Sequence, residues 1–296
     1  MRLLTYRKDG REQVGVLTVV GEEMFVCPIA AAGLPYDTMA ELVRGLNDEE
    51  RARLAALAAS RSAAAFPLKE VELLAPIPRP AQDIICLGIN YMDHAEESAR
   101  YKKEAFGGER PYAIYFSKRA NEAVGHGGFI ESHQDLTECL DYEAELAVII
   151  GREAKDVSEE NASDYIFGYS VFNDVSARDV QTRHKQWYFG KSLDTFTVMG
   201  PWIVTEEEIP FPPQLSIYSR VNGELRQNSN TRLLIFDVAH VISELSRGMT
   251  LLPGTIIAMG TPAGVGMGFT PPKWLKPGDV VECGIEKIGV LRNRIR

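Results

Sequence analysis

Two glutamates, Glu143 and Glu145, stand two positions apart in a mostly apolar run that ends at Gly151. Alternate side chains of a β-strand point to the same face of the sheet, so the two carboxylates would lie side by side. Ala147 and Ile149 continue that face, and the residues between them are apolar as well, a pattern typical of a buried strand. Because burying unpaired carboxylates is costly, the pattern predicts a cation between them.

A third acid would complete a site for a hard cation. Asp141 shares the parity of the two glutamates, so alternation alone does not decide which acids bind, and a solvated edge strand is the alternative. Asp174 follows another β-rich run, although an aspartate at a strand end more often caps a helix or begins a turn. Three carboxylates without a Cys or His cluster favour Mg²⁺ or Mn²⁺.

Other polar residues are candidates for acid–base chemistry or anion binding. If the segment around His94 is helical, Glu97 lies one turn away and would make the imidazole a stronger base for activating water. Arg178 and Gln181 are also three residues apart, and Lys191 follows a glycine between an aromatic patch and a strand. For each of these residues a position on the solvated surface is the alternative.

The glycine-rich segment 260–266 follows an apolar run but does not predict a nucleotide site. It lacks the Gly-Lys-Ser/Thr ending of a phosphate-binding loop. Pro271 and Pro272 stand where a dinucleotide-binding fingerprint would continue into a helix.

The composition is that of an ordinary soluble globular protein rather than a nucleic-acid or membrane protein. A formal net charge of −9 over 296 residues argues against nucleic acid and anionic membranes as partners. No run reaches the length of a membrane-spanning helix, and the N-terminus does not resemble a secretory signal. The four cysteines are too far apart for a close-spaced metal motif and do not resemble a disulfide framework, so we expect a reduced, cytoplasmic protein.

The pattern of elements predicts an α+β fold that is predominantly β. Residues 1–72 form a small N-terminal α/β domain, with a β-hairpin over 13–29 and two helices, the second running to about Ala65. A proline-rich connector precedes a larger domain over 73–296. Short strands dominate that domain, and 235–247 is the clearest helix.

Four motifs in this order resemble the fumarylacetoacetate hydrolase family, over about residues 76–296. They are Asn90-Tyr91-x-Asp93-His94, Asp141-Tyr142-Glu143-x-Glu145-Leu146, Asn173-Asp174-x-Ser176-Ala177-Arg178-Asp179 with Lys191, and Gly260-Thr261-Pro262-x-Gly264-Val265-Gly266. The resemblance implies a mixed β-roll catalytic domain that pairs as a homodimer.

The resemblance also implies roles for single residues. Glu143, Glu145 and Asp174 would hold Mg²⁺ or Mn²⁺, which replaces the cap interpretation of Asp174 and leaves Asp141 in a supporting position. The catalytic residues would be His94 and Glu97, on a lid segment, together with Lys191. Substrate would contact Arg178, Gln181 and Thr261.

Family members act on 2-oxo or 2,4-dioxo acids. The resemblance therefore implies C–C bond cleavage through a metal-stabilised enolate, as in an oxaloacetate decarboxylase or an acylpyruvate (diketo-acid) hydrolase. Segments 183–195 and 268–275 are similar to the bacterial branch with these activities. The alternatives are an isomerase or hydratase of 2-oxo-enoic acids and, less favoured, a binding protein whose catalytic site is dispensable.

Overall fold

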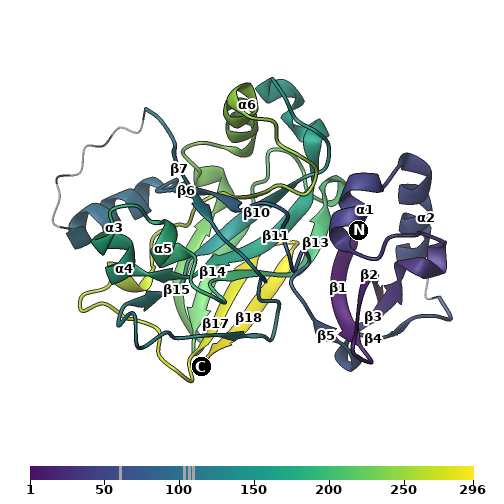
Figure 1. Cartoon of the computed structure of the whole chain (residues 1–296), viewed down its shortest axis with the longest axis horizontal. Helices are drawn as coiled ribbons and strands as arrows, with labels where there is room; N and C mark the ends of the chain where they lie inside the picture. Colours follow the sequence, from purple (N-terminus) through teal and green to yellow (C-terminus); the bar gives the residue numbers. More distant parts are fainter. Residues whose placement is uncertain (60–61, 103–104, 106–107, 109–110) are drawn as a thin grey trace.

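The computed structural model describes residues 1–59, 62–102, 105, 108 and 111–296. Within these residues the strands form an 11-stranded, a five-stranded and a two-stranded sheet. Figure 1 shows the long sheet running through the molecule, from the N-terminal strands at one end toward short helices at the other. The fold is α+β with strands predominating, which confirms the predicted class.

The first 73 residues contribute one side of the long sheet and two helices. Their elements are β1 (Arg2–Lys8), β2 (Arg11–Val20), β3 (Glu23–Pro28), α1 (Met39–Gly45), α2 (Asp48–Ala59), β4 (Phe66–Pro67) and β5 (Glu72–Leu73). The predicted hairpin is the β2–β3 pair. Because β1 pairs with β13 (Thr197–Thr205), the long sheet joins both sides of the predicted boundary, and the division into 1–72 and 73–296 stays a prediction.

The second N-terminal helix is shorter than predicted. It ends at Ala59, residues 60–61 lie outside the described residues, and 62–65 form a turn rather than more helix. In that turn the Ser62 side chain accepts a hydrogen bond from the backbone N–H of Ala64. Serine side chains that bond nearby backbone groups offer the chain an alternative to the helix.

The long sheet has the order β4-β3-β2-β1-β13-β11-β10-β16-β6-β7, with β5 beside β1. All its pairs are antiparallel except β16–β6. Its remaining strands are β6 (Ile84–Gly88), β7 (Ile114–Lys118), β10 (Ala144–Ile150), β11 (Ile166–Asp174) and β16 (Ile256–Ala258). The five-stranded sheet comprises β15 (Glu224–Asn230), β14 (Ser216–Val221), β17 (Val280–Ile285), β18 (Gly289–Ile295) and β8 (Phe129–Ile130), and β9 (Leu140–Asp141) pairs with β12 (Ser176–Ala177).

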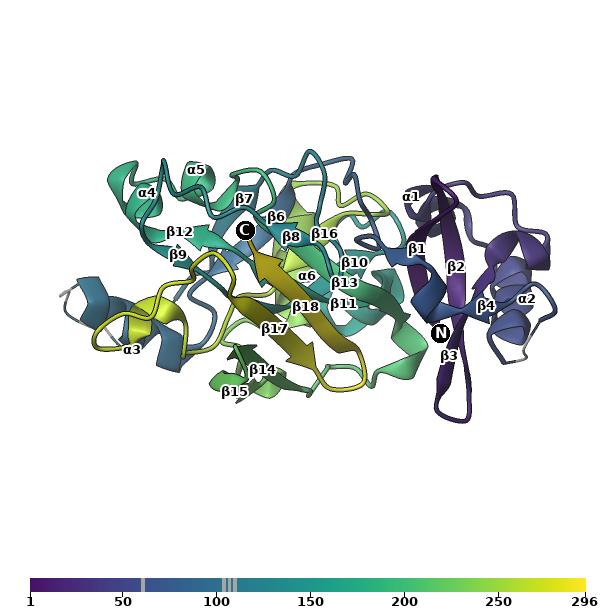
Figure 2. The same cartoon turned by 90° about the horizontal axis from the view of Figure 1, so that it is seen from below.

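Three helices gather at the end of the molecule opposite the N-terminal strands (Figure 1): α3 (Met92–Lys102), α4 (Arg178–Arg183) and α5 (Tyr188–Lys191). Figure 2 shows α3 beside the yellow C-terminal segment that follows β16. The predicted helix 235–247 is α6 (Val238–Gly248), which begins later because Asp237 caps it through the N–H of His240. Among the described helices, none is long and apolar enough to cross a membrane.

Strand β10 lies at the centre of the core and is buried at every position. Leu146 and Val148 pack in one hydrophobic cluster, whereas Ala147 and Ile149 pack in another. The strand is therefore apolar on both faces, and the solvated edge-strand alternative is wrong. Glu145 shares the face of Ala147 and Ile149 and is itself buried.

Candidate metal centre and active site

Three carboxylates meet where β10 begins and β11 ends. Glu143 precedes β10, Glu145 is its second residue, and Asp174 is the last residue of β11. The antiparallel register brings them together, and the backbone N–H of Asp174 donates to the carbonyl of Glu143 at 2.9 Å. One oxygen from each side chain lies within 4.8 Å of the others, and all three residues are buried. The two glutamates and the aspartate at the end of β11 thus form one cluster.

Asp174 does not act as a helix cap in this arrangement. The next helix, α4, has Ala177 as its N-cap residue, without a side-chain hydrogen bond. The Asp174 carboxylate instead contacts the ammonium groups of Lys118 and Lys191, at 2.6 and 2.7 Å. The cap interpretation is therefore wrong.

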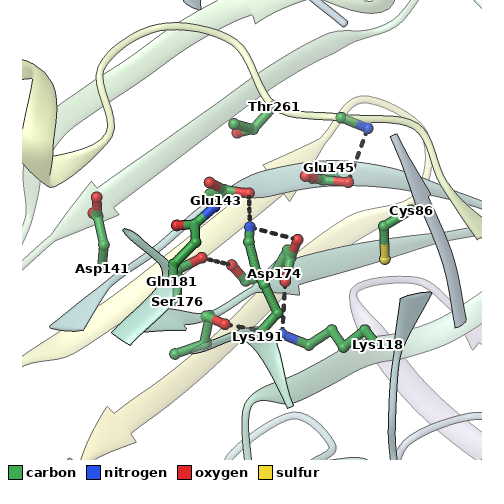
Figure 3. Close-up of polar contacts among 12 residues, drawn as sticks. Cys86, Lys118, Asp141, Glu143, Glu145, Asp174, Ser176, Gln181, Lys191 and Thr261 are labelled. Carbon is green, nitrogen blue, oxygen red and sulfur yellow. Dashed lines mark hydrogen bonds and ion pairs between the residues drawn. The ribbon is translucent and has the colours of Figure 1, made fainter. Parts of the chain in front are cut away.

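Three buried cations surround the cluster (Figure 3 shows the two lysines). Nζ of Lys191 lies 2.7 Å from Oε2 of Glu143 and 2.7 Å from Oδ2 of Asp174. Nη1 of Arg178 lies 2.6 Å from Oε1 of Glu143. Lys191 and Arg178 are 2% and 3% exposed, so the surface alternative for both residues is wrong.

The electrostatics of the two glutamates differ. Burial, followed by the charges of Asp174 and Glu143, raises the pKa of Glu145 well above its ordinary value. At Glu143, burial alone would raise the pKa, but Lys191 and Arg178 outweigh it and hold the pKa below its ordinary value. Burial and the neighbouring acids thus disfavour the charged form of Glu145, whereas the two cations favour the charged form of Glu143.

The donor set fits a hard divalent cation. All three acids offer carboxylate oxygens, the ligands that Mg²⁺ and Mn²⁺ prefer, and no histidine or cysteine belongs to the cluster among the described residues. A divalent ion would also favour the charged form of Glu145, which burial and the charges of Asp174 and Glu143 disfavour, so that its pKa is raised. Glu143, Glu145 and Asp174 are the residues that would hold it.

Asp141 lies outside this cluster and orders its surroundings. Its carboxylate accepts hydrogen bonds from the backbone N–H groups of Gly266 and Met267, at 2.6 and 3.1 Å. It also accepts from Nε of Arg178 at 2.9 Å. Asp141 thus ties the glycine-rich segment to the arginine that contacts Glu143.

His94 and Glu97 lie one turn apart on α3, as the spacing predicts for a helix. Nδ1 of His94 is 3.1 Å from Oε2 of Glu97, and both residues are 5% exposed. Oε1 of Glu97 accepts a hydrogen bond from the N–H of Gly264 at 3.0 Å. The alternative of an incidental surface histidine is therefore wrong.

A cavity of about 760 Å³ opens at the cluster. All of the predicted site residues line it except Glu97 and Asp174, which lie behind His94 and Lys191. Its wall also includes Phe116, Trp187 and Met267. A larger hollow of about 1440 Å³, beside the N-terminal strands and residues 121–129, contains none of the predicted site residues.

Arg178, Gln181 and Thr261 are held in place by side-chain hydrogen bonds. Nη1 of Arg178 donates to Oε1 of Gln181 at 3.2 Å. Thr261 donates to the carbonyl of Ala144 at 2.9 Å and accepts from Nε2 of Gln227 at 2.7 Å. These residues line the cavity from two directions, α4 and the glycine-rich segment.

The sequence argument missed two buried residues around the cluster. Lys118, the last residue of β7, donates to Oδ1 of Asp174 and to the carbonyl of Val175. Gln227, on β15, accepts from the N–H of Ala144 and donates to Thr261. A buried lysine facing an aspartate has no local sequence pattern, because the pair joins residues 56 positions apart.

A known protein family matches the part of the chain that contains all four motifs. Residues 83–296 match the family described as "Fumarylacetoacetate (FAA) hydrolase C-terminal". The chain belongs to the fumarylacetoacetate hydrolase family. This confirms the resemblance inferred from the motifs and identifies the protein as a member of a family of hydrolases, isomerases and related enzymes.

Three relatives illustrate the range of this fumarylacetoacetate hydrolase family. The chain is 49% identical over 230 residues to oxaloacetate tautomerase YisK of Bacillus subtilis, covering 78% of this chain and 75% of the relative. It matches the structure of a fumarylacetoacetate hydrolase from Exiguobacterium antarcticum with a TM-score of 0.83, 39% identity and coverage of 100% and 99%. It matches a 5-carboxymethyl-2-hydroxymuconate delta-isomerase from Mycobacterium smegmatis with a TM-score of 0.76, 30% identity and the same coverage.

Proposed function

We propose that this protein is a divalent-metal-dependent enzyme that converts a small 2-oxo acid through an enolate. The supporting observation is that two carboxylates of the buried cluster, Glu143 and Glu145, line one cavity together with His94 and Lys191. Glu143, Glu145 and Asp174 are the metal ligands, and the ion is Mg²⁺ or Mn²⁺. When bound, the ion supplies a Lewis acid for the carboxylate and 2-oxo oxygens of the substrate.

Lys191 stabilises the negative charge that develops on the substrate. Its side chain lines the cavity and is almost fully shielded from solvent. An ammonium in such a dry site interacts more strongly with a forming oxyanion than it would in water. Removing it should therefore slow every reaction that passes through an enolate.

The cavity mouth favours an acid with a second anionic group. Its lining includes the cationic side chains of Lys102, Arg183 and Lys185, although the chain as a whole carries a net charge of −9. Asp179 also lines the cavity and pairs with Arg183, which leaves the two lysines without an acidic partner among the described residues of this lining. Such a local excess of positive charge attracts anionic substrates against the overall field of the protein. Gln181 and Arg178 lie between this mouth and Glu143 and would contact the substrate.

Keto–enol tautomerisation of an oxaloacetate-like dicarboxylate is the first candidate reaction. The relative from Bacillus subtilis is named for that activity. Tautomerisation needs the enolate and a group that moves a proton, and His94 beside Glu97 is suited to that role. The reaction breaks no C–C bond.

Cleavage of a C–C bond, by hydrolysis of an acylpyruvate or by decarboxylation of oxaloacetate, is the second candidate. The buried His94–Glu97 pair favours the hydrolysis, because the same imidazole can take a proton from a water that attacks the distal carbonyl. Decarboxylation would need only the enolate. Isomerisation of 2-oxo-enoic acids would use the same enolate. We further propose that the protein is a homodimer. We also propose that it is cytoplasmic, which agrees with the four cysteines being free thiols.

Product analysis tests this proposal. The enzyme, freed of metal by a chelator, is assayed with Mg²⁺ or Mn²⁺ on oxaloacetate, acylpyruvates and 2-oxo-enedioates. We expect ion-dependent conversion of at least one of these acids, and the product identifies the reaction. Absence of conversion across the panel, together with a Glu145→Gln variant that keeps the full cellular effect of the wild type, would instead support a binding protein.

A further inference from the structure

Lys191 contacts the carboxylate cluster differently from the other two buried cations. Its Nζ bridges Glu143 and Asp174 at 2.7 Å from each (Figure 3), and so touches two of the proposed metal ligands at once. Among the described residues, Glu143 and Asp174 are the only hydrogen-bond partners of this ammonium nitrogen. The ammonium therefore occupies a position between two ligands that a metal ion would also need.

Arg178 and Lys118 are each fixed by a partner outside the proposed ligands. Arg178 touches Glu143 but is also bonded to Asp141 at 2.9 Å. Lys118 touches Asp174 but also donates to the carbonyl of Val175 at 2.9 Å. Arg178 and Lys118 can therefore stay in place if a metal ion replaces Lys191 as the partner of the carboxylates.

The two carboxylate oxygens of Glu143 and of Asp174 also have different partners. Oε1 of Glu143 pairs with Arg178 and Oδ1 of Asp174 with Lys118, whereas Lys191 holds the remaining oxygen of each carboxylate. Mg²⁺ requires ligand oxygens at about 2.0–2.1 Å. An ammonium and a divalent ion that share the same two oxygens would repel each other strongly in this buried site.

We propose that Lys191 is an exchangeable internal counter-ion, which a divalent ion displaces from Glu143 and Asp174 into the cavity. This rests on the proposed function. Without metal, the ammonium holds together carboxylates that would otherwise repel. With metal, the released ammonium faces the cavity that Lys191 lines, where substrate binds. Metal binding therefore prepares the positive charge that the substrate needs, and metal binds before substrate.

The test compares Lys191→Met with Lys118→Met, which removes the same charge from the same aspartate. Calorimetric titration with Mn²⁺ measures the affinity of each variant, and thermal unfolding is followed with chelator and with saturating Mn²⁺. We expect Lys191→Met to bind Mn²⁺ about tenfold tighter than the wild type, because no ammonium is displaced. In chelator, both variants should have a lower Tm than the wild type. Saturating Mn²⁺ should largely restore the Tm of Lys191→Met but not that of Lys118→Met.

Equal tightening in both lysine variants would overturn the proposal, because it would reflect charge removal alone. Weaker Mn²⁺ binding by Lys191→Met would overturn it too, since the lysine would then position the ligands. If that variant does not fold, Lys191→Gln serves, because its amide keeps a donor without the charge. A wild-type protein that binds no Mn²⁺ would contradict the proposed function itself, a different outcome from either of these.

Discussion

Nδ1 of His94 lies 3.1 Å from Oε2 of Glu97, while Oε1 of the same carboxylate accepts from the N–H of Gly264. The buried carboxylate of Glu97 thus orients the imidazole and links α3 to the glycine-rich segment 260–266. A carboxylate at Nδ1 favours the tautomer that leaves Nε2 free to accept a proton. His94 lines the cavity, so this nitrogen can serve a substrate or a water there.

Replacing His94 by alanine should separate the reactions that share the enolate. Hydrolysis of an acylpyruvate and enzyme-catalysed tautomerisation should slow by about 10²–10⁴-fold, the usual contribution of a positioned base. Decarboxylation of oxaloacetate, which needs no attacking water, should be retained. Comparing kcat for these reactions checks the assignment, and an equal loss in all of them would argue that His94 only supports the fold.

Gly268→Ala should disturb Glu97 without touching the metal site. A Cβ at this position would lie 1.6 Å from Oε1, 2.1 Å from Cδ and 2.6 Å from Cγ of Glu97, so the whole side chain of Glu97 would have to rotate away. We expect the variant to fold, to bind Mn²⁺ as the wild type does and to lose hydrolysis like His94→Ala. Gly248→Ala is the matched control, because an added Cβ there meets nothing within 4 Å. Full hydrolytic activity in Gly268→Ala would show that the position of Glu97 is unimportant.

The two glutamates of the cluster should differ in their effect on stability without metal. Glu143→Gln removes two buried ion-pair contacts, with Arg178 and Lys191, and should cost about 3–5 kcal/mol in the free energy of unfolding. Glu145→Gln should cost little or even stabilise, because burial and its acidic neighbours already disfavour its charge. Urea denaturation in the presence of chelator measures both, and similar losses would contradict this electrostatic account.

Divalent ions should stabilise the folded protein. An ion that binds only the folded state raises the free energy of unfolding by about 2.7 kcal/mol at 100 times its Kd. We therefore expect Mn²⁺ or Mg²⁺ to raise the Tm of the wild type, chelator to reverse the rise, and Glu145→Gln to show no such shift. A wild-type Tm that neither Mn²⁺ nor Mg²⁺ changes would contradict the presence of a metal site.

The sequence predicts the acidic cluster well because its signal is local. Strand periodicity places Glu143 and Glu145 together, and the apolar residues on both faces indicate burial. Asp174 is harder, because a carboxylate at a strand end is ambiguous until the pairing of β10 with β11 is known. The motif resemblance, rather than periodicity, resolves it.

The partners of the cluster escape sequence reasoning because they come from distant elements. Lys118 ends a half-exposed strand and meets Asp174 only through the fold. Gln227 lies on β15, whose residues ELRQNSN lack the apolar alternation of a strand, although the structure pairs it with β14. Lys191 has the local sequence of a surface lysine, and only tertiary packing makes it a counter-ion.

The most direct test of the central claim is the rate of oxaloacetate conversion by metal-free enzyme, before and after adding Mg²⁺ or Mn²⁺, corrected for the reaction of the free ion. We predict that chelation abolishes turnover, that either ion restores it in the wild type, and that neither restores it in Glu145→Gln. Undiminished turnover after metal removal, or a wild-type rate in Glu145→Gln, would contradict a metal-dependent site built on these carboxylates.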